Sequence, residues 1–364
     1  MKKNLIFFLP NFGPGGAGNS ILNICKYLNK KKYKIYVISL KKNFYKKELL
    51  KYCHEVKEID QIKTFFSLFE LENYFKNFDK NKTLIISNIN YANALFVVFF
   101  KTIYKYKIAI IERTPYQELN IYYGIKDFFK KLIIKIVIKT FYNKVDVLIA
   151  NSKKTAKDFE KIIKKNCEFV YPLTIHKKIN FRRRVNLKKS VKLLTIARLS
   201  REKKLEDQIN ALAIINNRKF SLNIVGDGLL KKELLSLINK LNVKTKIIPY
   251  SKKAKKKFLI ESDIYICSSD FEGFPNTVVE AINYGLPVIS SENHGGIKEI
   301  LLNGKGGDFY ELGNIKDLSN KICNIVNNYK MGLKKNKKAR DNLDRFSTNN
   351  IKKYEKIFDR TLTK

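Results

Sequence analysis

The chain has 364 residues, of which 73 are Lys or Arg and 33 are Asp or Glu, so its formal net charge is +40. This length exceeds one ordinary hydrophobic core and predicts two domains of roughly 150 to 180 residues each. With 45% apolar and 12% aromatic residues, the chain can bury two such cores, which excludes a disordered basic tail protein.

The basic surplus is spread evenly along the chain. Residues 1–180 hold 35 basic and 14 acidic residues (35 − 14 = +21), and residues 181–364 hold 38 and 19 (38 − 19 = +19). Only 10 of the basic residues are Arg, the side chain suited to bidentate recognition of phosphates and bases. We therefore expect no nucleic-acid partner; a Lys-rich composition from an AT-rich coding sequence and attraction to an anionic membrane both remain open.

Cysteine usage and the apolar segments predict a cytoplasmic protein. The five cysteines are dispersed without a CxxC pair, which is typical of free thiols in a reducing compartment. The apolar run Leu5–Leu9 stops at Pro10 and is too short for an export signal. The uncharged stretch Thr83–Phe100 approaches the length of a membrane span, but Ser and Asn residues interrupt it.

Short apolar runs alternate with helical patterns, which predicts parallel strands joined by helices. The expected strands of the first half are Leu5–Leu9, Ile35–Ser39, Leu84–Ser87, Ile108–Glu112 and Val147–Asn151. Those of the second half are Leu193–Ala197, Ser221–Val225, Lys246–Ile248, Ile264–Cys267, Pro287–Ser290 and Gly307–Tyr310.

The break between the two sets of strands defines the expected domains. Residues 174–190 show no periodicity and contain Arg182, Arg183 and Arg184, so they form the expected linker. The N-terminal domain then covers 1–173, the C-terminal domain 191–340, and a C-terminal helix over 341–364 can return to the N-terminal domain. The predicted fold class is α/β, with two Rossmann-like, doubly wound domains that face a central cleft.

A glycine-rich loop follows the first predicted strand. It runs from Pro10 through Asn11, Gly15 and Gly16 to Ser20, and an apolar helical pattern comes next. Glycines at a helix start allow backbone N–H groups to approach an anionic oxygen. The spacing matches neither GxGxxG nor GxxxxGK[ST], so a plain tight turn remains an alternative.

Two glutamates flank a predicted helix start in the second half. The segment Glu272-Gly273-Phe274-Pro275-Asn276-Thr277 leads into an apolar run that contains Glu280, which predicts a helix beginning near Asn276 or Thr277. The N–H groups at that start could hold a diphosphate, and Glu280 could accept hydrogen bonds from a ribose diol. Ordinary capping and a favourable interaction with the helix dipole are the structural alternative.

Cations follow the strand Leu193–Ala197. Arg198 and Lys203 could together neutralise a diphosphate and stabilise charge on it as it leaves. Arg198 is the more informative of the two because Arg is scarce in this chain, and a surface role remains open for both.

The motifs formed by these residues resemble those of a known protein family. Arg198-Leu199-x-x-x-Lys203, Val225-Gly226-Asp227-Gly228 and Phe271–Asn276 with Glu280 resemble the retaining GT-B glycosyltransferases of family 4, in which two glutamates are separated by seven residues. The likeness extends over almost the whole chain and is most specific from about residue 193 to 313.

The resemblance implies a nucleotide-sugar donor in the C-terminal domain and an acceptor on the N-terminal domain. It implies Glu280 at the ribose, Glu272 at the donor sugar, and Arg198 and Lys203 at the diphosphate with help from the Gly16 backbone. Further donor contacts are expected at Gly226, Gly273, Phe274, Pro275, Asn276 and Thr277. No metal or other cofactor is expected, and the sequence contains no Asp-x-Asp.

The sequence departs from the family at several positions. Where many relatives carry a His after an N-terminal strand, this chain has Glu112-Arg113-Thr114-Pro115, so Glu112, Arg113 and Asn11 are the acceptor-side candidates. Lys204 replaces the usual Gly after Lys203, and Pro249-Tyr250 replaces a Gly where a base would sit. The uridine assignment therefore rests mainly on the Glu272–Asn276 context.

The segment Asp127–Lys144 is mostly apolar with Lys131, Lys135 and Lys139 on one narrow stripe. It could lie on a bilayer surface, but we expect a buried helix with one solvent-facing edge. Peripheral contact with the inner face of an anionic membrane through scattered lysines also remains open.

The predicted function is transfer of a sugar, with retention of anomeric configuration, from a nucleotide diphosphate sugar, UDP-linked by expectation. The expected acceptor is a glycan or a polyprenyl or other lipid-linked saccharide in the assembly of surface polysaccharide, lipopolysaccharide or oligosaccharide. A GT-B sugar phosphorylase or nucleotide-sugar epimerase is the alternative, and a basic nucleic-acid-binding protein is a distant one. Requirement for an acceptor separates the first two, and salt-dependent binding of RNA or DNA would reveal the third.

Overall fold

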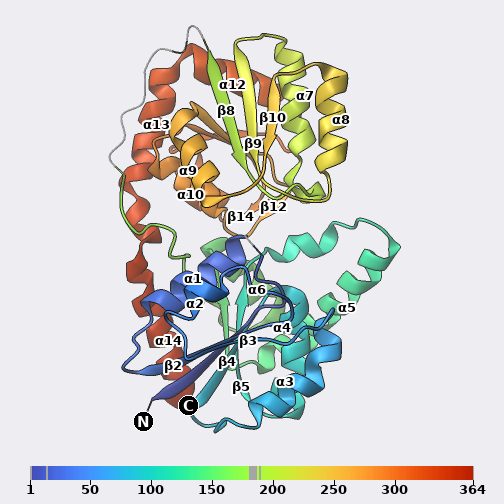
Figure 1. Cartoon of the computed structure of the whole chain (residues 1–364), viewed down its shortest axis with the longest axis vertical. Coiled ribbons are helices and arrows are strands. Elements are labelled where there is room, and N and C mark those ends of the chain that lie inside the picture. The colour runs from blue at the N-terminus through green and yellow to red at the C-terminus, as the bar shows by residue number, and fades with distance from the viewer. Residues whose placement is uncertain (1, 14, 180–186, 188–189, 364) are drawn as a thin grey trace. The chain divides into compact units, whose positions relative to one another are not determined.

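The computed structural model describes residues 2–13, 15–179, 187 and 190–363, and all structural statements below refer to these. The predicted linker run Arg182–Arg184 lies outside them. The chain divides into two compact units, Met1–Thr174 with Phe346–Lys364, and Ile175–Arg345. Each unit is described by itself (Figure 1).

The first unit is built on a parallel sheet with the strand order β3-β2-β1-β4-β5-β6-β7. Its strands are β1 (Lys3–Phe8), β2 (Tyr33–Ser39), β3 (Glu55–Glu58), β4 (Thr83–Asn88), β5 (Lys107–Glu112), β6 (Val147–Ala150) and β7 (Glu168–Phe169). Its α-helices are α1 (Gly16–Tyr27), α2 (Lys46–Leu49), α3 (Leu68–Phe75), α4 (Asn90–Phe96), α5 (Ile125–Phe141), α6 (Lys153–Ile163) and α14 (Ile351–Thr363). The order reverses between β1 and β4, as in a doubly wound fold.

The strands form as buried elements because their side chains are apolar on both faces. Leu5 and Phe7 of β1 pack on the face covered by α1 and α14, and Ile6 and Phe8 pack on the face covered by α3, α4, α5 and α6. The five strands expected in this half are confirmed within two residues at each end. The sequence analysis did not predict β3 and β7, because both are short edge strands that bury little apolar surface.

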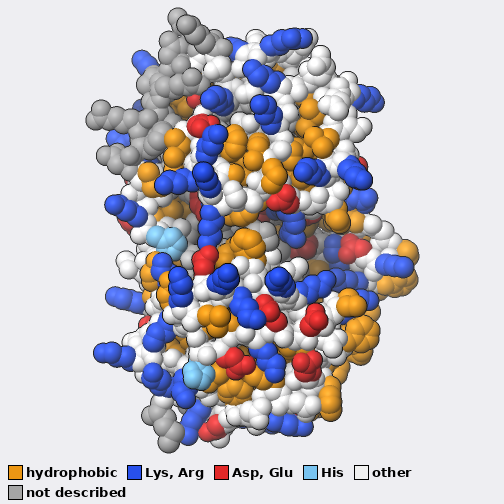
Figure 2. All heavy atoms as spheres, in the orientation of Figure 1, with side chains coloured by type: hydrophobic (Ala, Val, Ile, Leu, Met, Phe, Trp, Pro, Cys, Tyr) orange, Lys and Arg blue, Asp and Glu red, His pale blue; other side chains and the backbone are white. Residues whose placement is uncertain are grey.

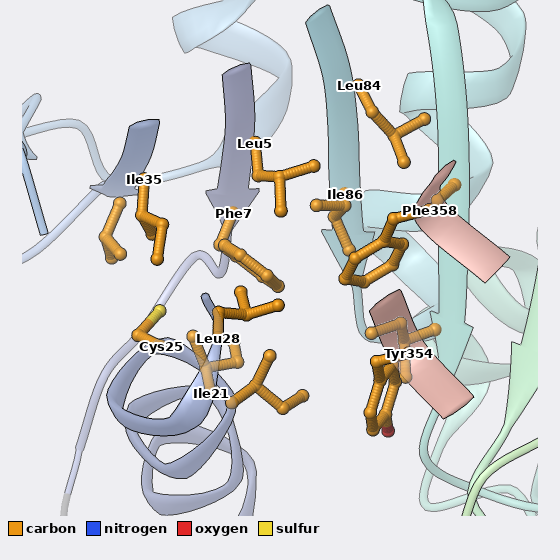
Figure 3. Close-up of a cluster of buried hydrophobic side chains, with 14 of the residues drawn as sticks. Leu5, Phe7, Ile21, Cys25, Leu28, Ile35, Leu84, Ile86, Tyr354 and Phe358 are labelled. Atoms are coloured by element: carbon orange, nitrogen blue, oxygen red, sulfur yellow. The ribbon is translucent and has the colours of Figure 1, made fainter. Parts of the chain in front are cut away.

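The C-terminal helix α14 completes the core of the first unit. Figure 3 shows Tyr354 and Phe358 of α14 against Phe7 of β1 and Ile86 of β4. The rings of Phe7 and Phe358 lie 6.2 Å apart in an edge-to-face arrangement, which adds about 1 kcal/mol to the burial of both rings. The last helix of the chain is thus part of the N-terminal sheet's covering layer.

The second unit repeats the doubly wound plan. Its parallel sheet has the order β10-β9-β8-β11-β13-β15, and a separate pair joins β12 to β14. The strands are β8 (Val191–Ile196), β9 (Phe220–Val225), β10 (Thr245–Ile248), β11 (Ile264–Cys267), β12 (Phe271–Glu272), β13 (Val288–Ser291), β14 (His294–Gly295) and β15 (Asp308–Tyr310). The α-helices are α7 (Leu205–Ile215), α8 (Lys231–Leu241), α9 (Lys252–Glu261), α10 (Asn276–Asn283), α11 (Ile297–Ile300), α12 (Ile315–Asn327) and α13 (Tyr329–Asp341).

Both ends of the second unit differ in detail from the sequence-based boundaries. Asn283 accepts a hydrogen bond from the Ile179 amide at 3.1 Å and donates one to the Lys177 carbonyl at 3.0 Å. These contacts attach the first residues of the expected linker to α10. At the other end, residues 341–345 belong to the second unit, whereas the sequence-based boundary assigns them to the C-terminal helix.

One expectation about the surface was wrong. The predicted solvent-facing edge of α5 contains Lys131, which is buried in the structure, while Ile133 and Ile136 are exposed. Lys131 donates to the Ile121 carbonyl at 2.6 Å and pairs with Asp127 at 2.9 Å, so its ammonium is satisfied inside the domain. Helical periodicity alone could not show which stripe of α5 faces the core.

Basic side chains are spread over the visible surface of both units, as expected from the even charge distribution (Figure 2). None of the helices described is long and apolar enough to cross a bilayer.

Candidate functional site

The reversal of strand order in the second unit brings two loops together. β8 and β11 are neighbours in the sheet and lie at the point where the order reverses. The loops after their carboxyl ends carry Arg198 and Lys203 on one side and Glu272 on the other. Ligands of doubly wound sheets bind at this place, because the loops diverge there and leave a crevice.

Lys203 and Glu272 form the central ion pair of this region. The Lys203 Nζ lies 2.5 Å from Glu272 Oε1, and the two side chains are only 14% and 20% exposed. Ser269 Oγ donates to the same carboxylate oxygen at 3.0 Å. Burial alone would lower the pKa of Lys203, but the Glu272 carboxylate outweighs it and raises that pKa, so the ammonium stays charged.

Buried hydrogen bonds hold the Lys203 loop in place. Gln208 Nε2 on α7 donates to Ser268 Oγ at 2.7 Å, and Ser268 Oγ donates to the Lys203 carbonyl at 2.7 Å. The Asp270 amide donates to the Glu202 carbonyl at 2.8 Å. The two loops are therefore linked by their backbones as well as by the ion pair.

Arg198 presents its guanidinium to solvent at the end of β8. Its side chain is 71% exposed and pairs with Glu202, with Nη2 3.6 Å from Oε1. The contact is too long for a strong hydrogen bond. Arg198 can therefore reorient toward an incoming anion at little energetic expense.

Helix α10 begins at Asn276, as predicted. Pro275 occupies its N-cap and supplies no side-chain hydrogen bond, while Gly273, Phe274 and Pro275 are buried beneath. The Thr277 hydroxyl accepts a hydrogen bond from Tyr265 at 2.8 Å. A helix start without a capping side chain leaves its dipole to be satisfied by another negative group.

Glu280, one turn into α10, is paired with a residue that the sequence analysis missed. Lys255 Nζ of α9 lies 2.7 Å from Glu280 Oε1, and both side chains are mostly buried. Glu280 Oε2 is also buried and has no hydrogen-bond partner among the described residues. No sequence signal distinguished Lys255 from the other lysines of the run Lys252–Lys257.

Gly226 has a packing role in the structure. Its amide donates to the Ile248 carbonyl at 2.9 Å, and a Cβ at this position would lie 1.8 Å from the Ala197 carbonyl oxygen. Next to it, Asp227 Oδ2 accepts a hydrogen bond from the Tyr250 amide at 2.8 Å. Gly226 and Asp227 thus set the path of the Pro249-Tyr250 loop; direct contact of Gly226 with a donor remains a prediction.

Gly295 supports Glu272 and was also missed. β12 and β14 pair Glu272 with Gly295, and the Gly296 amide donates to the Gly273 carbonyl at 2.9 Å. Gly295 has φ of +115°, and a Cβ there would lie 1.6 Å from the Glu272 carbonyl oxygen. The tandem glycines at 295 and 296 were the available signal for this close approach.

The acceptor-side candidates lie at or after the carboxyl ends of β1 and β5 in the first unit. Asn11 is exposed after β1, and Arg113 follows β5. Arg113 Nη2 and Nε donate to Asn88 Oδ1 at the end of β4, at 2.8 and 3.1 Å. Gly16 is the first residue of α1; its predicted contribution to the diphosphate remains a prediction.

Glu112 is buried completely, unlike the other acceptor-side candidates. Its Oε1 accepts hydrogen bonds from Asn93 at 2.9 Å and from the Tyr142 hydroxyl at 2.8 Å, and its Oε2 has no partner among the described residues. Burial raises the pKa of Glu112 to about 7, although these hydrogen bonds and Arg113 oppose the shift. A carboxyl in this state can hold a proton near neutral pH.

The backbone between β4 and α4 is strained. Ile89 has φ of +79°, a conformation that a β-branched residue adopts only when its surroundings impose it. It separates Asn88, which holds Arg113, from Asn90, whose Oδ1 accepts a hydrogen bond from Thr114 at 3.1 Å. Strain of this kind clusters at ligand-binding positions, which supports the placement of the acceptor region here.

Among the residues that the structure describes, no group of three or more His, Cys, Asp or Glu side chains is placed to hold a metal ion.

The fold and these two regions define a class: a GT-B protein with two doubly wound domains and polar or charged loops near the reversal of each sheet. Residues 177–343 match the family described as glycosyl transferases group 1, and residues 14–172 match glycosyltransferase family 4. The chain belongs to the group 1 glycosyltransferases of GT-B fold, which confirms the family predicted from the sequence; retention of anomeric configuration remains a prediction.

Curated relatives of the chain are named as glycosyltransferases. A Campylobacter jejuni protein named N-acetylgalactosamine-N,N'-diacetylbacillosaminyl-diphospho-undecaprenol 4-alpha-N-acetylgalactosaminyltransferase is 28% identical over 52% of this chain and 53% of its own length. A lipopolysaccharide 1,6-galactosyltransferase of Salmonella typhimurium is 27% identical over 34% of this chain and 36% of its own length. The chain spans about half the length of the first curated relative, and less of the second.

Solved structures share the fold over the whole chain. Anabaena HepE in complex with UDP-glucose has a TM-score of 0.79 at 17% identity and covers 100% of both chains. Sucrose-phosphate synthase from Thermosynechococcus elongatus has a TM-score of 0.80 at 13% identity and covers 100% of this chain and 99% of its own. The predicted fold class is confirmed.

The chain therefore belongs to a family of glycosyltransferases, and the two curated relatives above are named as sugar transferases.

Proposed function

We propose that this glycosyltransferase uses a UDP-sugar bound in the second unit and transfers the sugar to a glycan or lipid-linked acceptor bound in the first. The observation that carries the proposal is the Lys203–Glu272 pair at the reversal point of the second sheet, beside the exposed Arg198. Opposite charges held this closely suit a substrate that is anionic at one end and rich in hydroxyl groups at the other.

The proposed roles follow from the chemistry of each side chain. Lys203 and Arg198 bind the diphosphate and offset the charge that develops on it, which requires no metal ion. Glu272 accepts hydrogen bonds from hydroxyls of the donor sugar once Lys203 turns to the phosphate. Glu280 accepts hydrogen bonds from the ribose through its buried Oε2, which bonds to none of the residues that the structure describes.

The proposed reaction retains the anomeric configuration. The bond between the sugar C1 and the β-phosphate oxygen breaks, and the acceptor oxygen bonds to C1 from the same face. The acceptor's proton passes to the departing phosphate oxygen, so charge and atoms balance without a side-chain base. Lys203 and Arg198 stabilise the leaving UDP throughout.

Uridine is proposed as the base, and the HepE complex with UDP-glucose supports it because that protein shares the fold. The undecaprenol-linked substrate in the name of the C. jejuni relative supports a lipid-linked acceptor. We place the enzyme in the cytoplasm, in peripheral contact with the inner face of the membrane that holds such an acceptor. Whether the sugar is a hexose or an N-acetylhexosamine is left to experiment.

A thermal-shift screen tests the donor site. UDP, GDP and ADP are compared with the glucose, galactose, N-acetylglucosamine and N-acetylgalactosamine derivatives of UDP. A ligand at 100 times its dissociation constant adds about 2.7 kcal/mol to the stability of the folded state. We expect UDP and at least one UDP-sugar to raise the Tm; stabilisation by none of these compounds would exclude the proposed donor.

A further inference from the structure

We propose that the exposed apolar face of α5 is the surface through which the protein binds an anionic lipid bilayer. The exposed large apolar side chains of α5 recur every three or four residues; they are Ile125, Phe128, Phe129, Leu132, Ile133 and Ile136. This spacing places them on one face of the helix. Among them, Phe129, Ile133 and Ile136 are 55%, 61% and 53% exposed.

The opposite face of α5 explains why this apolar face points outward. Ile134 and Ile138 pack into the core of the first unit, and Lys131, about one turn before Ile134, is buried and bonds to the Ile121 carbonyl and Asp127. The helix therefore has two apolar faces, and only one of them is used by the fold. Hydrophobic side chains gather at the right-hand edge of the view in Figure 2, where Figure 1 labels α5.

A neighbouring segment adds further exposed apolar side chains. These are Ile62, Phe65, Phe66 and Phe69, around the 3₁₀ helix Thr64–Ser67 and the start of α3. Phe65 lies edge-to-face with Phe99, on the π-helix Val97–Ile103 that follows α4, with ring centroids 6.4 Å apart. A continuous apolar helix face such as that of α5 is unusual on the surface of a monomeric protein and indicates a binding surface.

The lysines around the apolar face of α5 favour an anionic lipid bilayer as its binding partner. By helical position, Lys126 and Lys130 flank the apolar face on one side and Lys135 flanks it on the other, while Lys139 follows Ile136 by about one turn at the C-terminal end of the face. Lys131 is paired with Asp127, the only acidic residue of α5, so four lysines remain around the apolar stripe. Long lysine side chains at the edges of an apolar helix face reach phosphate groups while the face enters the acyl region.

A second copy of the chain fits this surface less well than a bilayer does. Two copies packed through α5 would bring both sets of flanking lysines toward each other and would offer few carboxylates to neutralise them. An anionic lipid surface instead gains about 1 kcal/mol from each lysine near it. The biological role of this surface, access to a lipid-linked acceptor, rests on the proposed function. The test of the surface itself measures vesicle binding and needs no sugar transfer.

The test is cosedimentation with vesicles of phosphatidylcholine that contain about one third phosphatidylglycerol. The wild-type chain is compared with the triple variant Phe129→Gln, Ile133→Gln, Ile136→Gln. The matched control replaces three exposed apolar residues of the second unit, Ile214→Gln, Leu229→Gln and Leu312→Gln. We expect binding by the wild type and the control, and about tenfold or greater weakening in the α5 variant.

A second variant tests the contribution of the lysines to vesicle binding. Lys126→Gln, Lys130→Gln and Lys139→Gln should weaken binding to the anionic vesicles and reduce its dependence on salt, because fewer charges meet the lipid phosphates. All variants are first checked for cooperative thermal unfolding and for stabilisation by UDP, so a misfolded chain is recognised before its binding is interpreted.

The outcomes separate this inference from the proposed function. Equal vesicle binding by the wild type and a folded α5 variant, or no binding by the wild type, would overturn the inference. Self-association of the wild type that the α5 variant loses, without vesicle binding, would also overturn it in favour of a second copy. Failure of UDP to stabilise the wild type would remove the donor proposal but leave vesicle binding as measured.

Discussion

Lys255 of α9 holds Glu280 of α10 through a 2.7 Å ion pair, while the second oxygen of the same carboxylate is buried and has no hydrogen-bond partner in the part of the chain that the structure describes. Burial alone would lower the pKa of Lys255, but Glu280 raises it, so the lysine remains charged in its sheltered position. The pair therefore orients Glu280 and leaves Oε2 for one hydroxyl of the ligand.

The first prediction concerns Lys255 as a positioning residue. Lys255→Met should weaken UDP binding by about tenfold, because Glu280 loses the contact that orients it. The loss should be much smaller for 2'-deoxy-UDP, which lacks one of the hydroxyls that Glu280 would bind. Isothermal titration calorimetry measures both affinities, and Lys255→Arg should restore most of the binding of UDP.

Lys256→Met is the matched control, since it removes the same charge from an exposed position of the same helix. It should leave UDP affinity within about twofold of the wild type. Equal losses for UDP and its deoxy analogue in Lys255→Met would show that Lys255 acts on the overall fold or charge and not through Glu280.

The second prediction separates the two members of the Lys203–Glu272 pair. Lys203→Met should reduce UDP affinity by about tenfold to a hundredfold, since it removes a charge-assisted contact to the diphosphate. Glu272→Gln should keep or increase UDP affinity, because Lys203 no longer competes between carboxylate and phosphate. It should nevertheless abolish sugar transfer.

These effects are measured as the affinities of each variant for UDP and for the UDP-sugar. Sugar transfer is followed as the release of UDP in the presence of acceptor. Glu261→Gln, at the end of α9, is a control for removal of a carboxylate in the second unit. Parallel losses of UDP affinity in Lys203→Met and Glu272→Gln would contradict the division of roles between phosphate and sugar.

The third prediction concerns the pH dependence of stability. The pKa of Glu112 rises from an ordinary value of 4.5 to about 7 in the folded chain because its carboxyl is buried. Between these two values the unfolded chain loses the proton first, so the contribution of Glu112 to the free energy of unfolding falls as pH rises. Above about pH 7 the loss is complete and is on the order of 3 kcal/mol.

Glu112→Gln keeps the acceptor oxygen for Asn93 and Tyr142 but does not titrate. Relative to the wild type, this variant should therefore gain stability between pH 5 and pH 8, by about 2 to 3 kcal/mol. Urea unfolding of both proteins across this range provides the comparison. Glu118→Gln, a less buried neighbour, should show no such gain, and a pH-independent difference for Glu112→Gln would contradict the shifted pKa.

The fourth prediction concerns the glycine behind Glu272. Gly295→Ala should destabilise the second unit by about 3 kcal/mol or more, for two reasons. The added Cβ collides with the Glu272 carbonyl, and the alanine must adopt a positive φ. Gly313→Ala has a positive φ of +79° but nothing within 4 Å of the added carbon. It should lose only about 1 to 2 kcal/mol.

Thermal unfolding of both alanine variants gives the comparison, and UDP-sugar binding shows whether Glu272 has moved. Similar losses at positions 295 and 313 would mean that backbone conformation alone, and not the close approach to Glu272, makes glycine necessary at 295.

Much of the fold was predictable because it depends on local patterns. Buried strands such as Ile108–Glu112 are apolar on both faces, so their alternation with helices predicted two parallel α/β domains. The start of α10 was predictable for a similar reason, since Gly273, Pro275 and Asn276 are local signals of a turn and a helix start. The family resemblance depended on the same short segments.

Partners that are distant in the sequence were not predictable. Lys255 is one lysine in a lysine-rich helix, and only the packing of α9 beside α10 selects it as the partner of Glu280. Arg113 was proposed from the family resemblance, but its bond to Asn88 depends on the pairing of β4 with β5. Such pairs depend on the relative placement of elements, which no local pattern contains.

By itself, then, the sequence determined the family, the doubly wound fold and the loops that carry Arg198, Lys203, Glu272 and Glu280, because hydrophobic periodicity and turn-forming residues act over short distances. Only the tertiary structure decided which charges meet and which apolar stripe of α5 stays outside. The reason is that both faces of α5 are apolar, and burial of Lys131 against Ile121 and Asp127 fixes the rotation of the helix against the core.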